Sequence, residues 1–453
     1  METQKIVESQ RELFNSNKTK SISFRKATLK KMLLAIQQNE DEICNAIYQD
    51  LGKSKAESYG TEIGIVYGEI KEAIKNLDKW SRLQKVRGTI MTFPATNYIY
   101  SEPYGVTLIL APWNYPFLLT MAPLVGAIAA GNCVIMKCSK KSINTSKIIQ
   151  RILNGTFAKE YIYCVDAQIE YDEVIKQKYD YIFFTGSSNV GKTIMRAASE
   201  NLTPVSLELG GKNPCIVDKS ANLRLAAKRI VWGKFLTSGQ NCIAIDYIVV
   251  EDSVKDIFIK YLQEEIQNRY ADAENKDDYP NIINAHHYER LCKLIDNEKV
   301  VIGGRRNPEK RKIAPTILPE ADFDHEIMEE EIFGPILPVI GYRRLDDIIK
   351  KIKDRLKPLA CYIFTEDKHI ANKLISEISY GGGCVNDVVM YFANHHMPFG
   401  GVGNSGMGGY HGKFSFDTFS HKKGVMKNKT WIDISVRYAP YDEKKLKIFK
   451  RLL

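Results

Sequence analysis

The chain alternates between two hydrophobic periodicities, and this alternation predicts an α/β protein. Residues 3–80 repeat apolar positions at helical spacing. Residues 88–104 change to a β pattern, which predicts a hairpin-like excursion. From Val106 on, short β-branched runs alternate with helical segments: 106–110, 115–130, 134–137, 145–153, 162–165, 181–185, 189–200 and 205–209. Such βαβ alternation predicts a mainly parallel, doubly wound sheet, and a second α/β set follows from Asn213 to Asn386.

Length and composition narrow the class of protein. With 453 residues, 44% hydrophobic and 26% charged, the chain has room for two or three ordinary globular domains. The net charge of +10 is spread along the chain and suits an anionic cofactor or substrate, and no nucleic-acid-binding motif accompanies it. The nine cysteines are scattered and include no CxxC, which predicts a reduced, cytoplasmic protein.

Metal and membrane sites are not expected. The eight histidines include the pairs His286-His287 and His395-His396, but adjacent side chains point apart, so we predict no metal site. The N-terminus lacks a signal pattern, and prolines interrupt the uncharged stretch from Val106 to Met136. Residues 441–453 form a basic tail that ends in an amphipathic run. Its docking on the protein's own surface is favoured over contact with a membrane.

The segment Ser238-Gly239-Gln240-Asn241-Cys242-Ile243 offers a candidate nucleophile. It follows a helix-like apolar run and precedes the β-branched run 243–250, so the thiol lies at an element boundary. Helix termini or nearby cations can lower a thiol pKa and supply the reactive thiolate. On spacing alone, however, the favoured interpretation of Cys242 is a small buried apolar residue.

Further motifs carry chemistry elsewhere in the chain. Gly186–Gly191 follows a strand and opens a helix, as a phosphate-binding turn or an unliganded tight turn would. Glu208 ends a β run before two glycines, where it is either a general base or an ordinary surface residue. Asn114 either donates to an oxyanion or caps a helix that begins at Tyr115. Two glycine-rich segments, 331–335 and 398–408, could be simple turns.

In their order and spacing, these motifs together resemble the aldehyde dehydrogenase superfamily, with matches from about residue 100 to 425. The segment Gly408–His421 and the short N-terminus resemble its class 3 branch. The resemblance implies that Cys242 attacks an aldehyde to give a thiohemiacetal and then a thioester, that Asn114 and the Cys242 N–H hold the oxyanion, and that Glu208 activates the hydrolytic water. It also implies contacts to an NAD or NADP cofactor from these residues: Gly186, Ser187, Val190 and Gly191 near the phosphates, Glu331 and Phe333 at the nicotinamide ribose, and Lys137 at the adenosine ribose.

The resemblance further implies an aldehyde dehydrogenase fold in three parts. Residues 1–85 and 105–207 would form a Rossmann-like cofactor-binding domain, and residues 208–395 an α/β catalytic domain. Residues 86–104 and 396–440 would form a small β bridging region that makes a homodimer.

Two features bear on specificity. Family members often have Lys-Pro-Ser-Glu where this chain has Lys137-Cys138-Ser139-Lys140, and the cation at Lys140 favours NADP. The residues expected to line the aldehyde site are mostly aromatic and suggest medium-chain aliphatic or aromatic aldehydes: Tyr115, Trp232, Tyr391 and Asn394. The alternative is an acylating, coenzyme A-dependent enzyme, which the presence of Glu208 disfavours.

Overall fold

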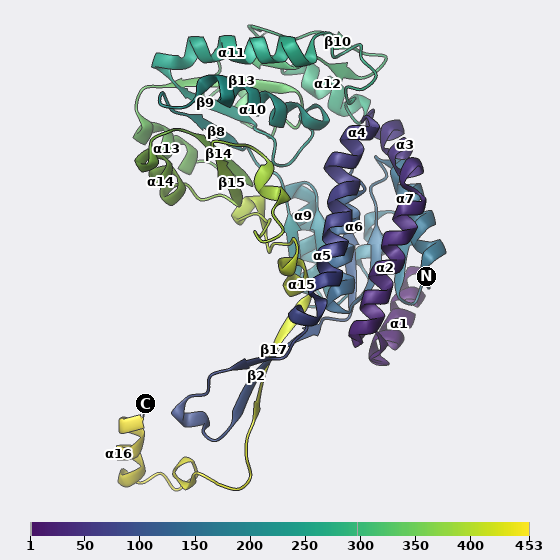
Figure 1. Ribbon diagram of the computed structural model, residues 1–453, viewed down its shortest axis with the longest axis vertical. Coiled ribbons are helices and arrows are strands. Elements are labelled where there is room, and N and C mark those ends of the chain that lie inside the picture. The colour runs from purple at the N-terminus through teal and green to yellow at the C-terminus, as the bar shows by residue number, and fades with distance from the viewer. Residues whose placement is uncertain (1, 297, 453) are drawn as a thin grey trace.

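Two six-stranded sheets with helices around them form two lobes, and a narrow three-stranded sheet projects from them as an arm (Figure 1). This computed structural model describes residues 2–296 and 298–452. The N-terminal helices predicted over residues 3–80 lie beside the first lobe: α1 (Glu2–Asn15), α2 (Ile22–Gln38), α3 (Glu40–Leu51), α4 (Lys55–Ser58) and α5 (Gly64–Trp80).

The first sheet has the strand order β16-β7-β6-β3-β4-β5. Its five long strands are parallel and nearly all buried, as expected where helices cover both faces. They are β3 (Val106–Leu110), β4 (Cys133–Lys137), β5 (Ile162–Val165), β6 (Tyr181–Thr185) and β7 (Val205–Glu208). The intervening helices are α6 (Leu118–Ala130), α7 (Ile143–Thr156), α8 (Tyr171–Ile175) and α9 (Ser188–Ser199). Because β3 lies between β6 and β4, the crossovers diverge there, and ligands of open α/β sheets bind outside the carboxyl ends of the strands at such a point.

The edge strand β16 (Gly406–Met407) comes from the far end of the sequence and pairs antiparallel with β7. Gly406 lies opposite Glu208, and Leu209 N donates to Ser405 O at 3.0 Å. The C-terminal region therefore completes the sheet beside Glu208.

The second sheet, of order β12-β13-β9-β8-β14-β15, is parallel throughout. Its strands are β8 (Pro214–Val217), β9 (Tyr247–Glu251), β12 (Thr316–Leu318), β13 (Ile336–Tyr342), β14 (Ala360–Phe364) and β15 (Gly382–Val385). Its helices are α10 (Leu223–Phe235), α11 (Asp252–Tyr270), α12 (Ala285–Lys293), α13 (Leu345–Lys353) and α14 (Lys368–Glu377), and a small ribbon joins β10 (Arg306–Asn307) to β11 (Lys312–Ile313). The two sheets thus account for the predicted succession of two α/β sets.

The arm consists of β1 (Gln84–Val86), β2 (Thr96–Pro103) and β17 (Ser420–Lys427), with α15 (Lys413–Thr418) at its base. The predicted excursion at 88–104 is therefore a hairpin, but Ile90–Thr92 forms a 3₁₀ turn where the β pattern predicted strand. The Thr92 hydroxyl accepts from Thr89 N and donates to Thr89 O, and these local bonds override the β propensity.

The basic tail ends in α16 (Glu443–Leu452) at the far end of the arm, and Leu453 lies outside the described residues (Figure 1). Docking of the tail on the chain's own surface was the wrong expectation, because no described residue of α16 is buried. Within the described ranges, the apolar side of α16 packs against no surface outside the tail 441–453. Among the described residues, no helix combines the length and the apolar character that crossing a bilayer requires.

Candidate active site

The loop that carries Cys242 has an unusual backbone. Thr237, Ser238 and Gly239 have φ of 52°, 53° and 72°, so three consecutive residues are left-handed. A side chain at Gly239 would clash with the carbonyl oxygen of Gly334, so this position requires glycine for conformation and for space. Left-handed threonine and serine are strained and persist only where surrounding contacts impose them.

Buried hydrogen bonds supply that constraint. The Gln240 amide donates to Thr237 O and Asn281 O, both at 3.0 Å, and its oxygen accepts from Ile283 N at 3.0 Å. Asn213 Nδ2 donates to Cys242 O at 2.8 Å. The loop is thus held from both sides, and the strand predicted to start at Ile243 begins only at Tyr247 in β9.

Cys242 is half-buried. Burial raises the pKa of Cys242 to about 12, and the charges of Glu331 and Glu208 act in the same direction. The sequence suggested a lowered pKa, but the helix before Cys242 presents its C-terminal end, and the neighbouring charges are negative. The thiol is therefore protonated at neutral pH, and its attack needs a base.

Glu208 ends β7, as predicted, and is 2% exposed. Burial raises the pKa of this carboxyl well above its ordinary value, and neither of its oxygens has a hydrogen-bond partner among the described residues. The alternative of an ordinary surface glutamate is wrong. A buried carboxyl left without partners and acting on a nearby thiol has the properties of a general base.

Asn114 is 4% exposed, and its amide Nδ2 donates to Gln240 O at 3.1 Å. It does not cap a helix at Tyr115, because α6 begins at Leu118. There the Glu62 carboxylate accepts from Phe117 N and Leu118 N, and Lys53 pairs with it at 2.7 Å. The Asn114 amide is therefore fixed to the Cys242 loop by one N–H, and its other N–H can serve a ligand.

The turn Gly186–Gly191 joins β6 to α9 at the carboxyl edge of the first sheet, as predicted. Ser187 is extended (φ −74°, ψ 150°) and makes no side-chain cap, so the first N–H groups of α9 are open to an anion. A side chain at Gly191 would approach Leu209, so glycine lets α9 pack closely. Val190 is 36% exposed beside it. These features fit the pyrophosphate of a dinucleotide.

Lys137 ends β4 and Lys140 follows it, but the two lysines lie in different surroundings. Lys137 is 1% exposed, and its ammonium donates to Ala167 O at 3.0 Å and lies 4.7 Å from the Tyr171 ring centroid. Lys140 is exposed and pairs with Glu170 at 3.0 Å. The second lysine is therefore accessible to a ligand, but an acidic residue accompanies it.

Glu331 and Phe333 lie on a loop that reaches toward the first sheet. Burial raises the pKa of Glu331 to about 8, with a further contribution from Asp246. Its carboxylate rests against Gly210, where any side chain would clash with it. Phe333 has a φ of 49° and meets Trp113 edge-on at 5.4 Å between ring centroids. The two residues thus contact Gly210 and Trp113, which follow the first-sheet strands β7 and β3.

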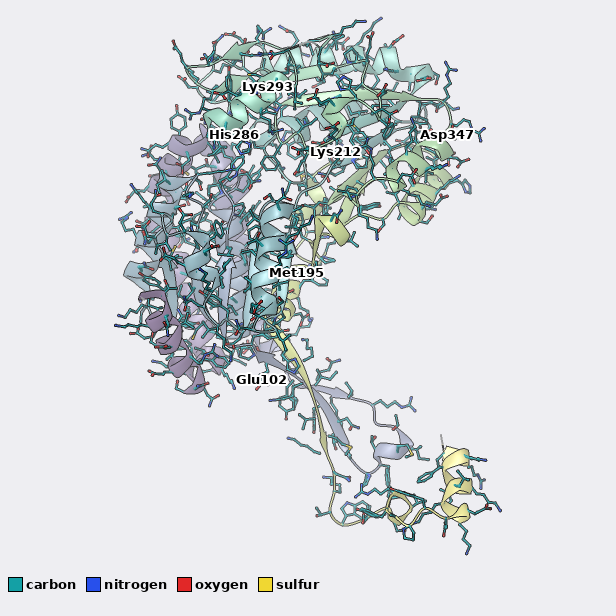
Figure 2. All side chains as sticks on the ribbon, turned by 180° about the vertical axis from the view of Figure 1, so that it is seen from behind. Glu102, Met195, Lys212, His286, Lys293 and Asp347 are labelled. Carbon is teal, nitrogen blue, oxygen red and sulfur yellow. The ribbon has the colours of Figure 1, made fainter. Side chains whose placement is uncertain are left out.

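Sequence patterns missed the residues that hold this loop. Lys212 Nζ lies 2.5 Å from Asp246 Oδ2 and donates to Glu330 O at 2.7 Å, while Asp246 Oδ1 accepts from Ile332 N at 3.0 Å. Figure 2 shows Lys212 within the lobe of the second sheet. Burial lowers the pKa of Lys234, whose amine has no partner among the described residues, to about 8. Lys212 lies in the motif that follows Glu208, but its role depends on contacts far along the chain.

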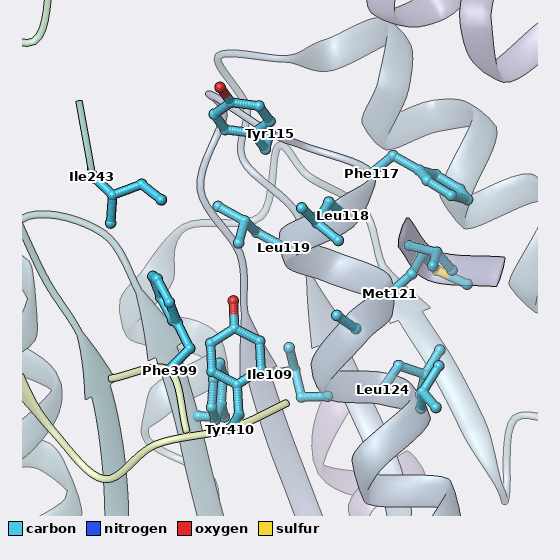
Figure 3. Packing of buried hydrophobic residues seen from close by; sticks show 14 of the residues in the cluster. Ile109, Tyr115, Phe117, Leu118, Leu119, Met121, Leu124, Ile243, Phe399 and Tyr410 are labelled. Carbon is cyan, nitrogen blue, oxygen red and sulfur yellow. The ribbon is translucent and has the colours of Figure 1, made fainter. Parts of the chain in front are cut away.

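The residues predicted to line the aldehyde site differ in exposure. Tyr115 and Tyr391 are buried, Trp232 is 38% exposed, and Asn394 is exposed. Figure 3 shows Tyr115 above Leu119 of α6, with Ile243, Phe399 and Tyr410 across from it. Ile243 follows Cys242 directly, so apolar and aromatic side chains surround the approach to the thiol.

Glu69, His395 and His411 gather three potential metal ligands within 4.8 Å, and within the described ranges they are the one such group found. Adjacent histidines such as His395 and His396 point apart, but the fold brings His395 together with His411 from a later segment of the chain. The Glu69 carboxylate already accepts from His395 Nδ1 at 3.0 Å and from Gly412 N at 3.1 Å.

Comparison with known proteins agrees with this geometry. The model of the aldehyde dehydrogenase family matches residues 1–425. The chain belongs to the aldehyde dehydrogenase family. It therefore oxidises an aldehyde to the carboxylic acid with NAD or NADP, and the fold is the aldehyde dehydrogenase fold. Relatives named as family 3 members in Mus musculus and Arabidopsis thaliana are 42% and 41% identical, which places the chain in the class 3-like branch.

Three similar proteins cover nearly the whole chain. The 4,4'-diaponeurosporen-aldehyde dehydrogenase of Staphylococcus aureus is 48% identical over 95% of each chain. A Canis lupus familiaris protein named "Aldehyde dehydrogenase, dimeric NADP-preferring" is 42% identical over 96% of this chain and 97% of its own. A substrate-bound structure of Staphylococcus aureus AldH superposes with a TM-score of 0.96 at 46% identity, covering 99% of this chain and 98% of that one.

Proposed function

We propose that Cys242, Glu208 and Asn114 carry out the oxidation of an aldehyde to a carboxylic acid. The observation that carries this assignment is the buried carboxyl of Glu208, which has no hydrogen-bond partner among the described residues and whose charge raises the pKa of the Cys242 thiol. The overall reaction consumes an aldehyde, water and oxidised cofactor. It yields the acid, reduced cofactor and a proton.

The first step joins Cys242 Sγ to the aldehyde carbon. Glu208 removes the thiol proton, because the raised pKa of Cys242 keeps the thiol protonated otherwise. The carbonyl oxygen becomes an oxyanion, for which Asn114 offers its free N–H and Cys242 its backbone N–H. The product is a thiohemiacetal on Cys242.

A bound nicotinamide cofactor would supply the hydride acceptor for the second step, which would leave Cys242 as a thioester. Glu208 first releases to solvent the proton that it took from the thiol, which is the proton of the overall reaction. It then takes a proton from water, the hydroxide displaces the thiolate to release the acid, and the thiolate recovers that proton from Glu208. A water-activating carboxyl supports hydrolysis over transfer to coenzyme A.

The cofactor would be held along the carboxyl edge of the first sheet. Gly186, Ser187, Val190 and Gly191 would face its phosphates, Glu331 and Phe333 its nicotinamide ribose, and Lys137 its adenosine ribose. Lys140 would attract a 2′-phosphate, so we propose a preference for NADP with residual use of NAD. The dog relative's name supports this direction.

The substrate is proposed to be a medium-chain aliphatic or aromatic aldehyde, because Tyr115, Trp232 and Tyr391 are aromatic. The domain boundaries given by the sequence are part of the same proposal: 1–85 and 105–207 for the cofactor, 208–395 for catalysis, and 86–104 with 396–440 for bridging. We place the protein in the cytoplasm, consistent with nine free cysteines.

A homodimer built through the arm is also proposed. The arm exposes apolar side chains that a partner could cover: Ile90, Met91, Phe93 and Met426. Light scattering at micromolar concentration should give a dimer mass, and a tetramer or monomer would contradict it. The sequence disfavours contact of residues 441–453 with a membrane. Liposome co-sedimentation of the protein with and without that segment tests this expectation.

The deciding experiment measures NAD- and NADP-linked activity across aliphatic and aromatic aldehydes, with and without coenzyme A. We expect turnover without coenzyme A and a higher kcat/KM with NADP. A strict requirement for coenzyme A would overturn the hydrolytic mechanism, and failure with every aldehyde would overturn the function.

A further inference from the structure

Glu69 joins two C-terminal segments to the N-terminal helix α5. The residue is 2% exposed, and its Oε1 accepts from His395 Nδ1 at 3.0 Å while Oε2 accepts from Gly412 N at 3.1 Å. A third group, His411 Nδ1, lies 3.1 Å from Oε1, near enough for attraction but not aligned as a hydrogen bond. One buried carboxylate thus contacts both ends of the segment 395–412.

That segment closes on itself between its two ends. Phe399 and Tyr410 exchange both backbone hydrogen bonds, at 3.0 and 2.8 Å. The ring of His411 lies 4.3 Å from Phe392 and 4.6 Å from Tyr410, measured between centroids, inside an aromatic cluster. The segment is therefore one packed unit, and Glu69 fixes the place where the unit meets α5.

Both sides of the reaction site depend on this unit. Asn394, which precedes His395 directly, is expected to line the aldehyde site, and Tyr391 lies one short turn earlier. Within the unit, Gly406 pairs with Glu208 across β16 and β7, and Ser405 O accepts from Leu209 N. A shift of the unit would therefore move the wall of the aldehyde site and the strand that carries the general base.

Glu69 stays ionised over the assay range, whereas His395 changes its charge with pH. Burial alone would raise the pKa of Glu69, but the hydrogen bond from His395, with help from His411 and Gly412, lowers it to about 2. The hydrogen bond to Glu69 raises the pKa of His395 above its ordinary value, and Glu72 on α5 adds to this. The other ionisable groups facing the contact are His411 and Tyr410. The charged Glu69–His395 pair is complete at low pH and is lost as pH rises through the pKa of His395.

We propose that Glu69 is a positioning residue for aldehyde oxidation, which holds the segment 395–412 so that the adjoining Asn394 and the Glu208 strand keep their places. This inference rests on the proposed roles of Cys242 and Glu208. In this role Glu69 contacts neither substrate nor cofactor, and its effect passes through His395 and Gly412.

The test compares Glu69→Gln, Glu69→Ala and His395→Ala, with His396→Ala as the matched control because His396 is the exposed neighbour. We expect Glu69→Ala to raise the KM for aldehyde by about tenfold while the KM for NADP changes by less than about twofold. Wild-type KM for aldehyde should rise as pH passes the pKa of His395, and this rise should be absent from Glu69→Gln and His395→Ala. The control should behave as wild type.

A merely structural role predicts a lower melting temperature with unchanged kinetics and an unchanged pH profile, and this result would overturn the proposal. If Glu69→Ala does not fold, Glu69→Gln and His395→Ala decide the matter by the same pH profile. In every comparison the wild-type enzyme must show aldehyde oxidation that Cys242→Ala abolishes. Its absence would refute the proposed function and not the positioning role.

Discussion

The carboxylate of Glu331 packs directly against Gly210. A side chain at this glycine, which follows the Glu208 strand, would occupy the position of the Glu331 carboxylate. Gly210→Ala should push Glu331 out of place and lower kcat/KM for the cofactor by about tenfold or more, because the proposed contact of Glu331 with the nicotinamide ribose would be lost. Stopped-flow measurement of cofactor reduction checks this. Gly155→Ala is the control, since nothing lies within 4 Å of a side chain there. Unchanged kinetics in Gly210→Ala would contradict the role of Glu331.

Cys242→Ala should lower aldehyde oxidation on the order of a thousandfold or more while cofactor binding stays intact, because no other group can form the thioester. Steady-state kinetics and fluorescence titration with NADPH measure the two properties. Cys384→Ala, which removes another half-buried thiol, should keep wild-type activity. Activity of Cys242→Ala within tenfold of wild type would refute the assignment.

Glu208→Gln should slow both the first-turnover formation of reduced cofactor and the steady rate, since Glu208 removes the thiol proton before it activates the water. Burial raises the pKa of Glu208, so the ionised base becomes more abundant as pH rises. The wild-type steady rate should therefore increase with pH, whereas the rate of Glu208→Gln should not follow the same curve. An unchanged steady rate in this variant would mean that another group activates the water.

Lys140 should determine the preference between cofactors, with Glu170 moderating it. The two exposed side chains pair at 3.0 Å, a contact that solvent weakens and that a 2′-phosphate could replace. Lys140→Glu should lower the NADP/NAD ratio of kcat/KM by about fivefold, and Glu170→Gln should raise it. Lys147→Glu, at an exposed lysine on α7, controls for net charge. If neither Lys140→Glu nor Glu170→Gln alters the ratio, Lys140 does not contact the phosphate.

Local patterns located most of the first sheet, because its strands are short, buried and rich in β-branched residues. The predicted limits of β3, β5 and β6 match the structure, and α7 and α9 lie where helical spacing placed them. The wrong predictions of secondary structure come from interactions that hydrophobic periodicity does not reflect. Hydrogen bonds of the Thr92 hydroxyl hold Ile90–Thr92 in a 3₁₀ turn where a strand was predicted.

The residues of the candidate site could be predicted from the sequence, but their protonation chemistry could not. The sequence named Cys242, Glu208 and Asn114, but only the folded chain shows that burial raises the thiol pKa to about 12. Glu69 escaped notice because its partner Gly412 is 343 positions away. A two-residue strand such as β16, made of glycine and methionine, has no periodicity at all.

The late position of β16 has a consequence for biosynthesis. Since Gly406 and Met407 pair with the strand that ends in Glu208, the edge of the first sheet stays bare until most of the chain has left the ribosome. A translation product that stops before residue 406 would carry Cys242 and Glu208 yet leave β7 open to foreign strands. We therefore expect prematurely terminated chains to aggregate and be degraded rather than to act as partial enzymes.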